Sequence, residues 1–121
     1  MRLPGPARRV NPETILTKQV REVLRLLGVV AFKHWGGMMG EKGVSDLIGV
    51  LPPSGRALFL ELKVPGKLPS AHQVAFLQRM KDAGALAFWA TSVQQVIGRL
   101  RREGYEPAMS MVIHGEPEAR A

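Results

Sequence analysis

The sequence predicts one α/β domain in which a mixed β-sheet is flanked by helices. With 121 residues the chain has the usual length of a single domain. Three segments carry apolar residues at helical spacing, and short strand-like runs separate them. A strand–helix–strand unit in the second half requires two parallel strands, whereas a hairpin before it is antiparallel. The expected order of elements is α-β-β-β-α-β-α.

The first helix is expected over residues 13–27. Asn11 suits the N-cap, Pro12 the first helical position, and Gly28 follows as the stop signal. The apolar positions recur at helical spacing: Leu16, Val20, Val23, Leu24 and Leu27. A short strand is expected over 29–35. The stretch Gly36–Gly40 that follows is too rich in glycine for a regular element.

A β-hairpin is expected next, with strands over 44–51 and 56–64. Pro52-Pro53-Ser54-Gly55 between them is typical of a turn, so the loop has four residues. In this register Leu51 faces Arg56.

Two more helices and two more strands are expected in the second half of the chain. They are a helix over 71–82, a strand over 85–90, a helix over 92–103 and an edge strand over 109–113. Capping-box patterns precede both helices, with Ser70 and Gln73 at the first and Thr91 and Gln94 at the second. Domain boundaries follow: a basic arm over 1–12, the folded domain over 13–114 and a frayed tail over 115–121.

Charge and composition narrow the function classes. The chain has 17 Lys and Arg against 10 Asp and Glu, a net charge of +7. The excess is concentrated in residues 1–40, which hold seven basic and two acidic residues. Such a balance favours a polyanionic partner, nucleic acid before a membrane surface, although solubility alone also accounts for it. The absence of cysteine excludes disulfides, thiolate zinc sites and cysteine nucleophiles.

Targeting signals are not expected either. No run of 18 apolar residues predicts a membrane span, and no apolar stretch follows the N-terminal arginines as in a signal peptide. We therefore expect a cytoplasmic protein that does not interact with membranes.

The hairpin brings three charged residues together. Asp46 is expected opposite Glu61, and Lys63 points to the same face of the sheet because side chains alternate along a strand. Facing carboxylates repel each other, so the pair makes sense if a divalent cation lies between them. Hard oxygen ligands suit Mg²⁺ or Mn²⁺, and a lysine beside them can hold water or phosphate. The alternative is that Glu61 and Lys63 are solvated strand residues and Asp46 belongs to a turn.

These residues resemble the signature of the VRR-Nuc domain, a family of the PD-(D/E)xK nuclease superfamily. The matching segments are Gly43-Val44-Ser45-Asp46-Leu47-Ile48-Gly49, Leu60-Glu61-Leu62-Lys63 and Gln73. The resemblance extends over about 13–100 and implies a restriction-endonuclease-like core. Ser45 stands where the superfamily has its name-giving proline, a substitution similar to that of other VRR-Nuc sequences.

The resemblance also implies roles for individual residues. Asp46 and Glu61 would bind the metal together with the main-chain carbonyl of Leu62. Lys63 would position the attacking water, and Gln73 would lie near the site. Glu13 matches an acidic residue of the family's first helix that completes the carboxylate cluster and thereby the catalytic set.

The function implied is that of a Mg²⁺- or Mn²⁺-dependent endodeoxyribonuclease that selects DNA by structure. Small stand-alone members look like virus-type or bacterial homodimers that act on branched DNA such as four-way (Holliday) junctions. The DNA backbone contacts are expected from basic residues of the arm and of glycine-containing loops: Arg8, Arg9, Lys42 and Lys67.

Two alternatives remain open at this point. The chain could be a nucleic-acid-binding module with cleavage lost or supplied by a partner, or a nuclease acting on flaps, duplex or single strands. The sequence does not assign roles to His34, His72 or the Gly36–Gly40 loop, and it does not define the number of metals.

Overall fold

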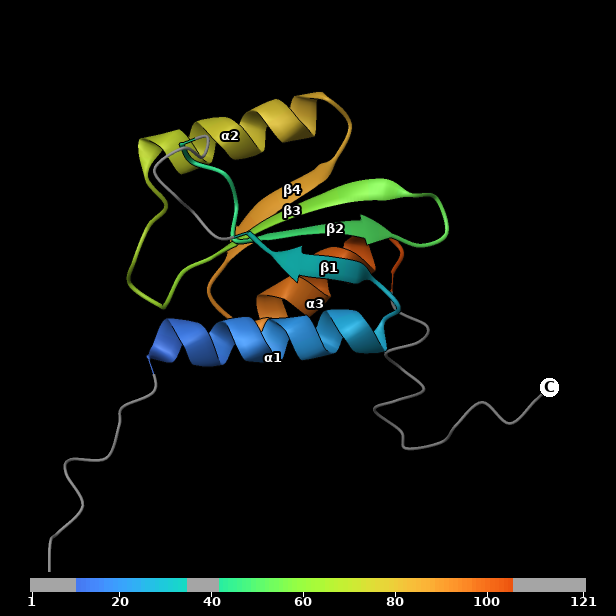
Figure 1. Ribbon diagram of the computed structural model, residues 1–121, viewed down its shortest axis with the longest axis horizontal. Helices are drawn as coiled ribbons and strands as arrows, with labels where there is room; N and C mark the ends of the chain where they lie inside the picture. Colours follow the sequence, from blue (N-terminus) through green and yellow to red (C-terminus); the bar gives the residue numbers. More distant parts are fainter. Residues whose placement is uncertain (1–10, 35–41, 106–121) are drawn as a thin grey trace, which may run out of the picture.

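The computed structural model describes residues 11–34 and 42–105 and contains one four-stranded sheet with three helices (Figure 1). The elements are α1 (Pro12–Leu26), β1 (Val30–Lys33), β2 (Leu47–Leu51), β3 (Arg56–Leu62), α2 (Ala71–Asp82), β4 (Leu86–Ala90) and α3 (Val93–Arg102). Strands lie side by side in the order β1-β2-β3-β4. β1 and β2 are antiparallel, as are β2 and β3, whereas β3 and β4 are parallel. The predicted fold class and element order are confirmed.

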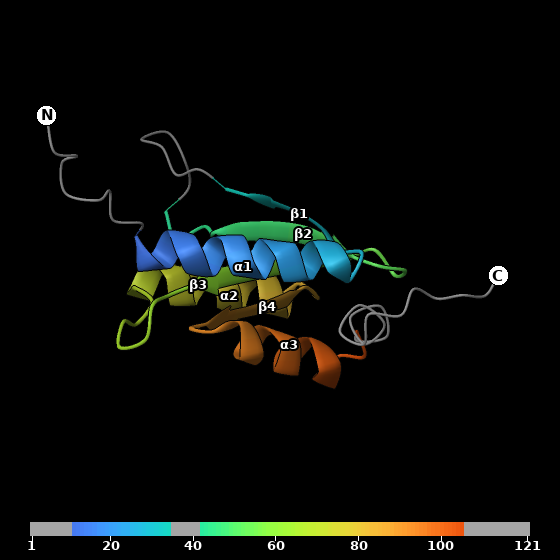
Figure 2. The same cartoon turned by 90° about the horizontal axis from the view of Figure 1, so that it is seen from below.

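The helices cover opposite faces of the sheet. α1 and α3 pack on one face, and α2 lies on the other (Figures 1 and 2). Leu47, Leu58 and Leu60 are fully buried in the larger core beneath α1 and α3. The smaller core lies under α2, where the rings of Phe59 and Phe76 meet edge to face with centroids 5.5 Å apart. Alternation along β3 thus directs even-numbered leucines to one face and Phe59 and Glu61 to the other.

The hairpin has the predicted register, with Leu51 facing Arg56 and Leu47 facing Leu60. The predicted first strand is too long, however, because β2 begins at Leu47 rather than at residue 44. Gly43 has a positive φ of 83°, and Asp46 lies in a bend. Both conformations break the extended backbone before β2. The prediction of strand over 29–35 is likewise longer than β1.

Side-chain caps explain where the helices begin. The Asn11 side chain accepts the Glu13 N–H at 2.8 Å, as predicted for α1. Ser70 and Gln73 form the predicted reciprocal capping box of α2. The prediction for α3 was wrong by one residue. Its N-cap is Ser92, the residue after Thr91, and the Ser92 hydroxyl oxygen accepts the Gln95 N–H at 3.1 Å.

Several predicted segments lie outside the described residues. These are most of the basic arm over 1–12, the Gly36–Gly40 loop, the edge strand over 109–113 and the tail over 115–121. Pro12 is the first residue of α1, as its capping pattern predicts, so the arm ends one residue earlier than the predicted boundary of 1–12. None of the helices within 11–34 and 42–105 has the length and apolarity needed to span a membrane.

Candidate active site

Asp46 lies one residue before β2 and is bound to both neighbouring strands. Its backbone carbonyl accepts the His34 N–H at 2.7 Å, which continues the β1–β2 ladder beyond β1. Its carboxylate oxygen Oδ2 accepts the Leu62 N–H of β3 at 3.0 Å. The side chain therefore occupies the place of a ladder hydrogen bond, which fixes the carboxylate at the end of β3.

Glu61 is a buried carboxylate, with only 1% of its surface exposed. Its Oε2 atom accepts a hydrogen bond from Gln73 Nε2 at 2.8 Å and lies 3.4 Å from Lys63 Nζ. Within the described part of the chain, the other oxygen, Oε1, is buried and has no hydrogen-bond partner. Buried carboxylate oxygens are normally satisfied, so this atom is free to act as a ligand. The alternative of a solvated Glu61 is wrong.

The surroundings of Glu61 make its carboxyl group a weak acid. The pKa of Glu61 is raised from its ordinary value of 4.5 to about 7, mainly by burial and next by the negative charge of Asp46. Lys63 acts in the opposite direction, since its ammonium group favours the ionised carboxylate. At neutral pH the group therefore lies near half-protonation, which a bound cation would shift toward the carboxylate.

Gln73 connects this carboxylate to the start of α2. Its amide oxygen Oε1 accepts the Ser70 N–H at 2.7 Å, and its amide nitrogen donates to Glu61. The capping bond thereby orients the amide so that its N–H points at the carboxylate. The two roles considered for Gln73, helix capping and a place at the site, are both fulfilled by one side chain.

Gly43 brings the loop before Asp46 against the same helical turn. A Cβ atom at this position would lie 2.3 Å from the carbonyl oxygen of His72 and 3.1 Å from the Gln73 nitrogen. Only glycine permits so close an approach, and the positive φ favours glycine as well. Sequence reasoning used Gly43 as part of a motif but did not find this contact. It also missed that Ser45 is fully buried and that its hydroxyl donates to the Leu47 carbonyl.

The other predicted site residues are more distant or more exposed. Glu13 is exposed in the first turn of α1. No group of three or more His, Cys, Asp or Glu side chains within 11–34 and 42–105 is placed to hold a metal ion, so Glu13 is not gathered with the two carboxylates. Lys42 and Lys67 are exposed, as is His72, while His34 is half-buried. Arg8 and Arg9 lie outside the described residues.

The two carboxylates fit a divalent cation. A buried carboxylate oxygen without a hydrogen-bond partner in the described chain, beside a second carboxylate, supplies the hard oxygen ligands that Mg²⁺ and Mn²⁺ prefer. Mg²⁺ usually takes only one or two protein carboxylates and keeps several waters, so a third acidic residue is not required.

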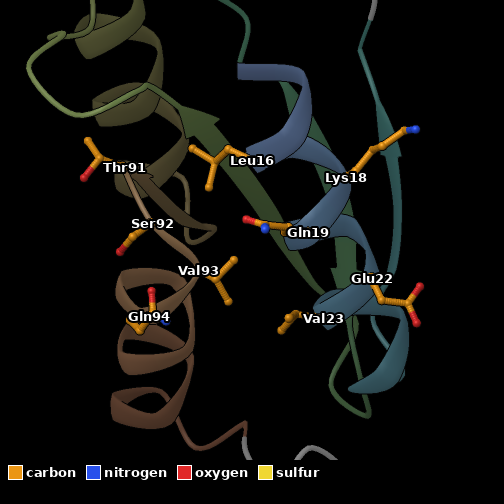
Figure 3. Close-up of a pocket in the computed structure, with 9 residues that line it drawn as sticks. All are labelled: Leu16, Lys18, Gln19, Glu22, Val23, Thr91, Ser92, Val93 and Gln94. Carbon is orange, nitrogen blue, oxygen red and sulfur yellow. The ribbon is translucent and has the colours of Figure 1, made fainter. Parts of the chain in front are cut away.

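A hollow elsewhere on the molecule is separate from the carboxylate site. It measures about 710 Å³ and lies between α1 and the start of α3 (Figure 3). Its acidic residue, Glu22, forms an exposed ion pair with Arg25 at 2.6 Å. The hollow lies on the α1 side of the sheet, opposite the face that carries Glu61, so it does not contribute to the carboxylate site.

The raised pKa of Glu61 predicts a pH-dependent stability in metal-free buffer. Because the folded-state pKa lies above the unfolded value, ionising Glu61 destabilises the fold as pH rises from about 4.5 to about 7. We expect Glu61→Gln to remove this loss, which is on the order of 3 kcal/mol. Urea unfolding at pH 5 and pH 8 with chelator would measure it, and Glu22→Gln on the surface is the control. A mutant that gains no stability relative to wild type between these pH values would contradict the assignment.

The contact of Gly43 with α2 predicts a large cost for Gly43→Ala. Gly55→Ala is the matched control, because Gly55 has nearly the same φ, 82°, but no described atom within 4 Å of an added Cβ. Both variants should lose roughly 1–2 kcal/mol from the left-handed backbone conformation. Gly43→Ala should lose at least about 2 kcal/mol more in urea unfolding, because its Cβ meets backbone atoms. Equal losses in the two variants would show that the contact carries no energy.

Comparisons with known proteins agree with this fold and with the motif. No family model matches the sequence, and no curated protein matches it. A solved structure described as "VRR_NUC domain" is similar, with a TM-score of 0.66 and 29% sequence identity. The match covers 79% of this chain and all of that chain. Together with the motif residues at the end of β3 and the start of α2, this match supports a VRR-Nuc domain, and the mixed sheet flanked by helices is that of a restriction-endonuclease-like fold.

Proposed function

We propose that the protein is a divalent-metal-dependent endodeoxyribonuclease that hydrolyses phosphodiester bonds in DNA of a particular structure. The observation that carries the proposal is the oxygen of the buried Glu61 that has no partner in the described chain. It lies beside the Asp46 carboxylate, and the other oxygen of Glu61 is 3.4 Å from Lys63. A folded protein gains no stability from such a group, because burial without a partner costs free energy. Its retention is explained by binding of a cation.

The residues divide into ligands and positioning groups. Asp46 and Glu61 would hold Mg²⁺ or Mn²⁺, with the Leu62 carbonyl as a further ligand. When bound, the metal lowers the pKa of its water and stabilises negative charge on the phosphate. Lys63, whose side chain is 19% exposed, is close enough to the site to hold water or a phosphate oxygen. Gln73 keeps Glu61 in place through its hydrogen bond. Glu13 would join this set only if α1 or the site rearranged.

Charge supports DNA as the substrate. The chain carries +7, and exposed Lys42 and Lys67 lie in the loops before β2 and after β3. Together with Arg8 and Arg9 they would contact the phosphate backbone, which positions DNA without reading bases. No described helix presents a base-reading motif, so selection would be by shape, with branched DNA such as a four-way junction as the preferred substrate.

A binding module without its own cleavage activity is the competing function. The carboxylates, Lys63 and Gln73 argue against it, because a module that only binds DNA needs no buried acidic site facing a polyanion. Flaps, duplex and single strands are the competing substrates of a nuclease.

Cleavage assays with Asp46→Asn test the proposed function. The asparagine Oδ1 can still accept the Leu62 N–H, so the fold is kept while the ligand charge is lost. We expect metal-dependent cutting of a four-way junction by wild type, and at least a roughly 100-fold loss in the mutant. Asp82→Asn, at the exposed end of α2, is the control and should retain activity.

The same assay separates the alternatives. It would compare the junction with matched duplex, splayed-arm and flap DNAs in Mg²⁺, Mn²⁺ and chelator. Cutting of other structures in preference to the junction would keep the nuclease and reject the branched substrate. DNA binding without cleavage, unchanged by Asp46→Asn, would favour the binding module.

A homodimer is the proposed assembly. An apolar strip on β1 and β2 supports it: Val30 is 71% exposed, Phe32 56% and Val50 48%. Val30 faces Val50, and Phe32 faces Ile48, so the strip is continuous. It lies on the face of the sheet that carries Phe59 and α2. Packing of a second copy here would give two active sites, which suits paired cuts on a two-fold symmetric junction.

Phe32→Asp should convert the proposed dimer to a monomer. A charge in the centre of an apolar interface is left without a partner, and its burial opposes association. Leu68→Asp is the control, because Leu68 is 76% exposed in a loop and should not affect assembly. Light scattering after size exclusion at micromolar concentrations measures the mass. A monomeric wild type, or equal behaviour of the two variants, would contradict the interface.

A further inference from the structure

Trp89 occupies an unusual place next to the carboxylate site. It lies on β4, the outer strand of the described sheet, and its register partner on β3 is Glu61. Register partners on parallel strands point to the same face, so Trp89 and Glu61 share the face that carries α2. Trp89 is 39% exposed, whereas its neighbours Phe88 and Ala90 are 7% and 1% exposed. An indole ring beside the catalytic strand is thus available to a ligand.

Trp89 lines a hollow between α2 and the edge of β4. The hollow measures about 320 Å³, at the lower end of the roughly 300–1,000 Å³ of small-ligand pockets. Val74 and Leu77 of α2 are among the apolar residues that line it with Trp89, and Val74 is itself 50% exposed. Gln78, Lys81 and Arg99 also line the hollow, so it combines an indole face on which a flat ring can stack with polar and cationic groups.

The rim of the hollow is basic. Lys81 comes from the last turn of α2, and Arg99 reaches the hollow from α3 on the other face of the sheet. The Arg99 guanidinium is held 5.0 Å from the centroid of the Phe88 ring and 3.9 Å from Glu103. Among the described residues, none that lines the hollow is acidic. An aromatic platform flanked by cations is the arrangement with which proteins bind single-stranded nucleic acid.

The hollow lies next to the strand position of Glu61, although Glu61 itself does not line it. Val74 directly follows Gln73, which hydrogen-bonds to Glu61, and Trp89 is the strand neighbour of Glu61. A DNA strand bound at the carboxylates would therefore have Trp89 on the neighbouring strand. The two sites are neighbours on the same face of the sheet.

We propose that the hollow binds an unpaired base of the DNA substrate, stacked on Trp89, with Lys81 and Arg99 at the adjoining backbone phosphates. This inference rests on the proposed nuclease function and names the feature of the substrate that the site selects. A base within an intact duplex is stacked on its neighbours and would have to leave the helix to reach the indole ring. The protein therefore favours DNA with unpaired nucleotides next to the cut.

Binding assays with Trp89→Leu test the inference, with Trp89→Phe as the variant that retains an aromatic ring. Fluorescence anisotropy would measure the Kd of the full chain for a labelled splayed-arm DNA and for a blunt duplex of the same sequence, in chelator. Trp89→Leu should weaken splayed-arm binding by roughly 5- to 100-fold, as expected for the loss of one stacked base, and duplex binding by less than about 2-fold. Trp89→Phe should restore most of the affinity, which a merely structural defect would not allow.

Lys81→Gln tests the basic rim against Lys18→Gln, an equal charge change on exposed α1. Lys81→Gln should weaken splayed-arm binding more than the control does. Three results would each overturn the inference. The first is an equal effect of the two lysine variants, and the second is an equal effect of Trp89→Leu on both DNAs. The third is a change in oligomeric mass for Trp89→Leu with unchanged DNA binding.

Cleavage assays distinguish failure of this inference from failure of the proposed function. If wild type cuts DNA and Trp89→Leu cuts a splayed arm and a duplex in the wild-type ratio, the nuclease stands and the inference fails. If no substrate is cut but splayed-arm binding depends on Trp89, the inference stands and the proposed function fails.

Discussion

The burial of the Glu61 carboxylate is the constraint on which the rest of the site depends. Removing a carboxylate from water is costly, and only one of its two oxygens has partners within the described residues. Lys63 reduces the cost by its charge, and Gln73 reduces it by a hydrogen bond. The part of this free-energy cost that is not offset is seen in the pKa of Glu61, which is raised to about 7. The site is therefore poised between a protonated and an ionised form, and a cation would determine which one prevails.

The elements around Glu61 are arranged so that each one fixes the next. The β2–β3 register places Asp46 beside Leu62, and the Asp46 carboxylate takes over a ladder hydrogen bond there. Gly43 seats the preceding loop on the first turn of α2. That turn carries Gln73, which returns to Glu61. Backbone contacts thus determine the site as much as its charged side chains do.

Much of this organisation could be predicted from local sequence signals. Turn residues at 52–55 are enough to predict the hairpin register, and that register alone brings Asp46 toward Glu61. Features that depend on contacts between residues far apart in the sequence could not be predicted. The late start of β2 at Leu47 depends on the bend at Asp46. Burial of Glu61 depends on α2, which follows β3 in the sequence only after a loop. The exposure of Trp89 likewise reflects the edge position of β4 in the described sheet, which periodicity does not reveal.

The shared duty of Gln73 limits which sequences this fold can accept. Glutamate and glutamine both occur at the third helical position of a capping box, since either side chain can accept the N-cap N–H. Here the same side chain must also donate a hydrogen bond to Glu61, which the glutamine amide can do and an ionised glutamate cannot. A substitution that is silent in most helices would set a third carboxylate against the pair. The residue that caps α2 therefore also determines how much negative charge gathers at the carboxylate site, so a change at position 73 alters both.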